Sequence, residues 1–153
     1  MIIQAGFDLE LLARPFIIQE DKLLPRLVVI GLDAEMQLES ITVASDHFTG
    51  KLEPEFDAVL DELESQRIRY FAIAHAGIWA EHCPPWEVPI IQEAAGLKVL
   101  ADQRGFRMIG HLGIDETGYM CDGPHMYFDQ YPLGDDLPCT MSHWVHSSYR
   151  GYD

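Results

Sequence analysis

Hydrophobic and polar residues in the first third of the chain are arranged as in β-strands. Residues 14–20 have an apolar centre between polar ends, and residues 24–33 contain a β-branched run that is too short for a helix. In residues 37–43, which follow a turn-like stretch at 33–35, every second side chain belongs to one set and the side chains between them belong to another. Because alternation is typical of a strand with two different faces, we expect residues 37–43 to pair with residues 24–33 as a hairpin.

Two later segments have the spacing of amphipathic helices. Residues 54–67 place apolar residues on one side and carboxylates on the other, and residues 89–101 carry a second apolar stripe. Pro89 suits the first turn of a helix, and Gly105 is placed to end the second helix in a left-handed conformation. The sequence therefore predicts one helix in each segment.

The remaining apolar runs predict three more strands. Residues 70–75 form a short run that ends at a histidine, and a turn-like stretch separates residues 106–112 from residues 117–121. The order strands, helix, strand, helix, strands predicts an α/β domain over residues 1–122, with a mixed central sheet flanked by helices. Residues 123–153 have no clean period, and we expect an aromatic- and proline-rich tail that packs on the domain or on a partner.

The amino-acid composition restricts the classes of binding partner and the cellular compartment that we expect. The chain has 153 residues, 25 Asp and Glu against 10 Lys and Arg, and a formal net charge of -15. This length suits one domain, and the charge disfavours binding to a phosphate backbone, so we expect no nucleic-acid partner. No apolar run approaches the roughly 20 residues that cross a bilayer. Three cysteines cannot all pair within one chain, which favours a reducing cytoplasm.

Three stretches of the sequence resemble one known family. They are VVIGLDAEMQL at 28–38, FAIAHAG at 71–77 and LADQRGFRMIGHLGIDETGYMC at 100–121. Together they resemble the RadC branch of the JAB (JAMM, MPN) metalloprotease-like domains over roughly residues 25–122, with Gly110 and His111 in the place of that branch's Asp-His pair. The resemblance implies a three-layer JAB/cytidine-deaminase-like α/β domain.

The resemblance also implies a zinc site, of which this chain keeps one ligand. In the family, two histidines and an aspartate hold zinc, a glutamate activates the bound water and a serine helps to stabilise the oxyanion. His75 matches the first ligand, but Gly77 stands in the place of the second histidine. The family's spacing puts Pro85 and Val88 in the serine and aspartate places, or Glu87 and Ile90 if the loop is two residues longer. No motif selects the upstream glutamate.

A decayed metal centre predicts a non-catalytic role. We expect an inactive RadC/JAB-like domain that acts as a protein-binding or assembly module without a cofactor. Its ligand would be a protein partner or a second copy of the chain, as in a homo-oligomer. The binding cleft would be lined by two strand residues and three loop residues. These are His75, Trp79, His82, Trp86 and His111.

Other interpretations remain open at this point. A metal-dependent peptidase or isopeptidase could use a rearranged zinc site of His75, His82, Cys83 and His111, because His and Cys are proper zinc ligands. A hydrogen-bonded histidine in a relic pocket is the interpretation that we favour for His75. A small-ligand pocket between the tryptophan loop and the sheet is a third possibility. A further group, Cys139, His143 and His146, fits no zinc module and is better explained as an exposed tail.

Overall fold

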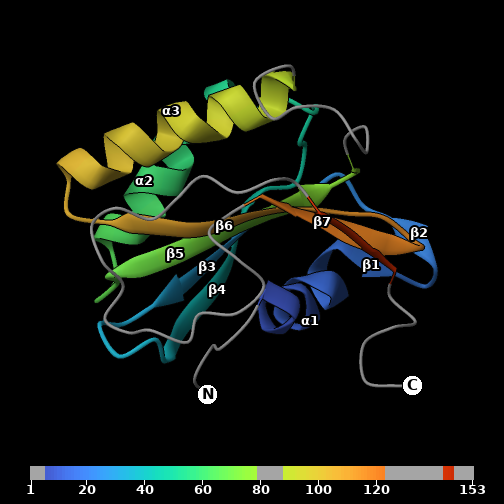
Figure 1. Ribbon diagram of the computed structural model, residues 1–153, viewed down its shortest axis with the longest axis horizontal. Helices are drawn as coiled ribbons and strands as arrows, with labels where there is room; N and C mark the ends of the chain where they lie inside the picture. The colour runs from blue at the N-terminus through green and yellow to red at the C-terminus, as the bar shows by residue number, and fades with distance from the viewer. Residues whose placement is uncertain (1–5, 79–87, 123–142, 147–153) are drawn as a thin grey trace.

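A six-stranded mixed β-sheet lies at the centre of the molecule (Figure 1). The computed structural model describes residues 6–78, 88–122 and 143–146. The strands, in sheet order, are β4 (Leu38–Ser45), β3 (Leu27–Leu32), β5 (Tyr70–Ala76), β6 (Arg107–Ile114), β7 (Gly118–Asp122) and β8 (His143–His146). Neighbouring strands are antiparallel except for β5 and β6, which are parallel. The predicted α/β class with a mixed central sheet is confirmed.

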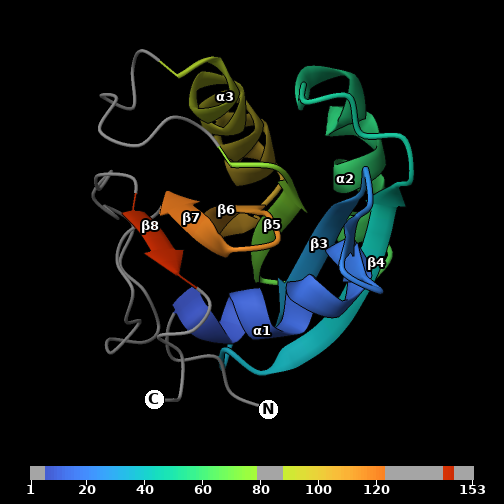
Figure 2. The same ribbon diagram turned by 90° about the vertical axis from the view of Figure 1, so that its right-hand side faces the viewer.

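Helices cover both faces of this sheet (Figure 2). Helix α1 (Gly6–Ile17) packs on one face, and α2 (Phe56–Glu64) and α3 (Pro89–Gln103) pack on the other. A short 3-10 helix, η1 (Glu53–Glu55), leads into α2, and a two-stranded sheet of β1 (Ile18–Gln19) and β2 (Lys22–Leu23) follows α1. Three layers result, with the helix pair and the single helix on opposite sides.

The central strands are apolar throughout because both of their faces are buried. In β3 all six residues are buried, with Val28 and Ile30 in the cluster beneath α1 and Val29 in the cluster beneath α2 and α3. The same alternation in β5 sends Ala72 towards α1 and Ile73 towards the helix pair. A strand between two helix layers needs such a continuous apolar run.

The predicted strand at residues 14–20 is wrong, because most of this segment belongs to α1. Leu9, Ala13 and Ile17 are spaced four residues apart and are fully buried against the sheet. This helical stripe begins before residue 14, so the apolar centre of 14–20 is the end of a helix face. Pro15 lies in the last turn of the helix and does not prevent it.

The other predicted elements that the structure describes are confirmed, with small shifts in their ends. Gly105 adopts a φ of 88° after α3, and the amide of Phe106 donates to the Ala101 carbonyl while that of Gly105 donates to the Asp102 carbonyl. These two bonds form a Schellman motif, as the glycine predicts. No helix in the described residues is long and apolar enough to cross a membrane.

Part of the predicted tail joins the sheet. His143–His146 form β8, which pairs antiparallel with β7 at the sheet edge. His143 and His146 therefore do not share a helical face, and Cys139 lies outside the described residues. The rest of 123–153 also lies outside them, so the domain boundary at residue 122 stays a prediction.

Candidate functional site

Two of the predicted site residues meet on neighbouring strands. His75 lies near the end of β5, and His111 lies in β6, where it is paired in register with Ile73. His75 and Ile73 are two residues apart on one strand, so both imidazoles project from the same face of the sheet. Ile73 belongs to the apolar cluster beneath α2 and α3, which places the histidines on that side.

The two imidazoles form a closed pair inside the protein. Their Nε2 atoms are 2.7 Å apart, and the residues are 3% and 1% exposed. The ring of Phe48 stacks on His75 with a centroid separation of 4.9 Å and an interplanar angle of 28°. No hydrophobic period singles out Phe48, which follows β4 in a connecting segment, so sequence patterns could not identify this contact.

The hydrogen bonds fix how the protons are placed in the pair. The Ala76 carbonyl can only accept, so Nδ1 of His75 donates to it across 3.2 Å. Nε2 of the neutral His75 ring then has no proton and accepts the Nε2–H of His111. A backbone carbonyl often orients a metal-binding histidine in the same way, but here the freed lone pair is already used by another imidazole.

Burial keeps both rings neutral at physiological pH. Loss of hydration lowers the pKa of His75 from 6.5 to about 4, and the hydrogen bond to the Ala76 carbonyl opposes this shift. Burial also lowers the pKa of His111 well below its usual value, and repulsion from His75 lowers it further. The His75 ring must be neutral to accept this hydrogen bond through Nε2, so electrostatics and geometry agree.

The backbone changes direction where the family has its second histidine. Gly77 has a φ of 92°, and its amide donates to the Ile114 carbonyl across 2.7 Å. Residues with a Cβ rarely adopt this conformation, because the Cβ atom comes too close to the following carbonyl oxygen. A histidine at position 77 would therefore be strained unless the backbone moved.

The described residues do not provide a complete metal site. His75 and His111 offer two nitrogen ligands, and no group of three His, Cys, Asp or Glu side chains comes together in the part of the chain that the structure describes. A catalytic zinc needs three protein ligands. His82 and Cys83, the other predicted ligands, lie outside the described residues, as do Trp79 and Trp86 of the predicted cleft.

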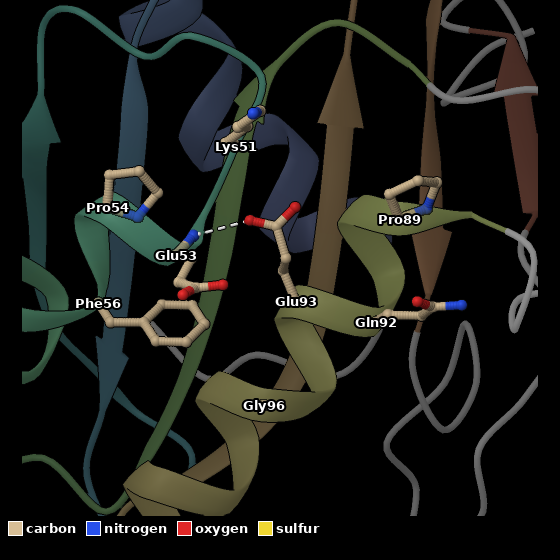
Figure 3. Close-up of a pocket in the computed structure, with 8 residues that line it drawn as sticks. All are labelled: Lys51, Glu53, Pro54, Phe56, Pro89, Gln92, Glu93 and Gly96. Carbon is tan, nitrogen blue, oxygen red and sulfur yellow. Dashed lines mark hydrogen bonds between the residues drawn. The ribbon is translucent and has the colours of Figure 1, made fainter.

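A separate groove lies beside the first half of α3, on the same side of the sheet (Figure 3). It has a volume of about 790 Å³, and its walls come from the segment that leads into α2 and from the first half of α3. The lining residues are Lys51, Glu53, Pro54 and Phe56 on one side and Pro89, Gln92, Glu93 and Gly96 on the other. Glu93 from α3 accepts the backbone amides of Leu52 and Glu53, each across 2.8 Å, and so joins the two walls. Sequence patterns did not predict this groove, because its walls come from segments about 40 residues apart.

No family model matches the chain, and no curated protein is found to match it. The likeness to JAB domains therefore depends on the quoted motifs alone.

Proposed function

We propose that the chain is a RadC-like JAB domain without the family's metal centre, which acts as a protein-binding or assembly module. Helix layers on both sides of a mixed sheet are the architecture that the resemblance implies, and this supports the assignment. We expect the domain to work in the cytoplasm. Its charge of -15 favours a protein ligand over a nucleic acid.

One observation carries this proposal. His75, which matches a zinc ligand of the family, uses its Nε2 lone pair to accept a hydrogen bond from His111. To bind an ion between the rings, His111 would have to lose or move its Nε2 proton, and the internal hydrogen bond would break. With Gly77 in the place of the second ligand, the described donor set does not fit a hydrolytic zinc.

The enzyme alternative has a specific observation in its favour as well. The structure brings together two of the four residues proposed for a rearranged site, with their Nε2 atoms facing each other. A peptidase would still need further ligands from outside the described residues. A hydrolysis assay separates the alternative from the proposal.

The assay compares variants of the buried and exposed histidines. Fluorogenic peptide and isopeptide substrates are incubated with the wild-type chain, with and without added zinc, and with His75→Gln and His111→Gln. The exposed His47 provides a matched control in His47→Gln. We expect no zinc-dependent turnover by any of the four proteins. Turnover by wild type and His47→Gln that is lost in both buried variants would overturn the proposal.

A further inference from the structure

Strand β4 forms an open edge of the central sheet. It pairs with β3 on one side, and Figure 2 shows it as the outermost strand at the edge opposite β8. It has eight residues, whereas β8 has four. Within the part of the chain that the structure describes, no backbone hydrogen bond joins the outer side of β4 to another segment.

The backbone groups on this outer side belong to Ile41 and Val43. In an antiparallel pair every second residue bonds to the neighbouring strand, and the residues between them point the other way. An amide of β5 donates to the carbonyl of Arg26, in register with the pairing of β3, so every second residue from Arg26 bonds to β5. Val29 lies between two such residues and bonds to its partner Thr42 in β4. The neighbours of Thr42 on both sides therefore point outwards.

This edge lacks the features that usually keep a sheet edge from pairing. Natural edge strands carry lysine, proline or bulges, or are covered by another segment. Strand β4 has no Lys or Pro, and Glu39 is its one charged residue. Its two irregularities of register with β3 lie towards its ends and leave residues 40–43 regular. A strand of this kind favours the addition of a further strand.

The apolar side chains of β4 are incompletely buried within one chain. Ile41 and Val43 pack against the cluster beneath α1, and both stay partly exposed. Their partners in β3, Ile30 and Val28, are fully buried. A further strand would lie about 4.8 Å from β4 and would cover the exposed part of both side chains.

The sequence of β4 is complementary to itself in the antiparallel direction. Two copies related by a twofold axis must place their outward-facing residues opposite each other. An axis at Thr42 places Ile41 opposite Val43 of the second copy, and such β-branched pairs stabilise a sheet. An axis at Ile41 would instead place Glu39 opposite Val43. The axis at Thr42 is therefore the better register.

Charge restricts where two copies can meet. Each copy carries a net charge of -15, so two copies repel each other wherever carboxylates would come together. The five residues 40–44, which are centred on Thr42, carry no charge. We propose that β4 pairs antiparallel with β4 of a second copy about Thr42 and joins two sheets into one. This inference rests on the proposed role as an assembly module.

Sedimentation velocity of the full chain over a range of concentrations tests the inference. We expect a monomer–dimer equilibrium that shifts towards the dimer as salt rises, because salt screens the repulsion between two acidic copies. A chain that stays monomeric at every concentration and salt would overturn the inference, and would leave the edge to a strand of another protein.

Charge variants at the twofold axis test the register. Thr42→Lys and Thr42→Glu each place two like charges directly opposite each other in the dimer, so each should raise the dimer Kd about fivefold. An equal mixture of the two variants should recover dimer formation, because Lys then faces Glu. An unfolded variant would not recover, so the mixture separates lost pairing from a lost fold. Gln66→Lys and Gln66→Glu change an exposed residue after α2 and should dimerise as wild type does.

The outcomes separate this inference from the proposed function. Dimers that form equally well in both Thr42 variants would place the contact elsewhere and overturn the inference, as would a mixture that dimerises no better than its components. Strand β3 separates β4 from the strand that carries His75, so zinc-dependent hydrolysis would overturn the proposed function while sedimentation still reports on β4. A monomeric chain without hydrolytic activity would overturn the inference alone.

Discussion

At the scale of single residues, the histidine pair is the feature that decides whether His75 can bind a metal ion. The ring of His75 is oriented as a ligand would be, with Nδ1 bonded to a backbone carbonyl. Its other nitrogen is bonded to His111 in a site closed by Phe48. A residue type that suits metal binding is thus used to fix two strands against each other.

The lowered pKa values predict that acid destabilises the fold through this pair. The unfolded chain takes up a proton on His75 near pH 6.5, whereas the folded chain does so near pH 4. The unfolded state therefore binds more protons in this window. The free energy of unfolding should fall as the pH drops from 6.5 to 4, by up to about 3 kcal/mol from His75 alone.

Urea denaturation at a series of pH values checks this effect against two variants. His75→Phe with His111→Leu should lose the decrease between pH 6.5 and 4 that the pair causes. His47→Gln, which changes an exposed histidine, should keep the wild-type pH dependence. If the double variant followed the same pH profile as the wild type, the two buried rings would not be the neutral pair described above.

Two glycines should respond in opposite ways to alanine. Gly77 has a φ of 92°, so Gly77→Ala should cost about 1 to 2 kcal/mol of unfolding free energy. Gly96 lies within α3 with room for a Cβ, so Gly96→Ala should gain about 0.5 to 1 kcal/mol. The urea denaturation midpoints of the two glycine variants test these opposite effects. A Gly77→Ala protein as stable as wild type would remove the backbone argument against a histidine at position 77.

At the scale of elements, α1 closes the second face of the sheet. Leu9 is fully buried, whereas Leu11 on the same helix is 48% exposed. Leu9→Ala should therefore lower the unfolding free energy by about 2 to 5 kcal/mol, because it leaves a cavity against the sheet. Leu11→Ala should change it by about 0.5 kcal/mol or less. Similar losses in the two variants, measured by urea denaturation, would be incompatible with this orientation of α1.

Sequence patterns predicted those helices and strands whose hydrophobic spacing is complete within one segment of the chain. The apolar runs of β3 and β5, the stripe of α3 and its glycine cap all follow from spacing within one segment. Helix α1 was missed because Phe16 and Ile17, its last apolar residues, adjoin Ile18 and imitate a strand. Its stripe becomes visible only when residues before Pro15 are included.

The candidate site was predictable in its residues but not in its bonding. The end of an apolar run marked His75 as a candidate, and the resemblance marked His111. Parallel pairing of β5 with β6 brings the two together. Whether two such rings would face an ion or each other depends on register and on backbone direction at Gly77. Neither follows from the spacing of residues along one strand.

At the scale of the whole molecule, the fold presents two different sites on one side of the sheet. The histidine pair is internal, and the groove between the segment that leads into α2 and the first half of α3 opens to the surface. A binding module needs an accessible surface, whereas a hydrolase needs a loaded metal that reaches its substrate. The charge of -15 adds a general preference for basic partners.

The metal content of the purified chain tests the central claim most directly. The wild-type chain, His75→Gln and His47→Gln are purified without chelator and without a nickel resin. Their zinc content is measured by inductively coupled plasma mass spectrometry. We predict a zinc content far below one ion per chain, equal in all three proteins. One zinc per chain in wild type and His47→Gln, absent from His75→Gln, would contradict the loss of the metal centre.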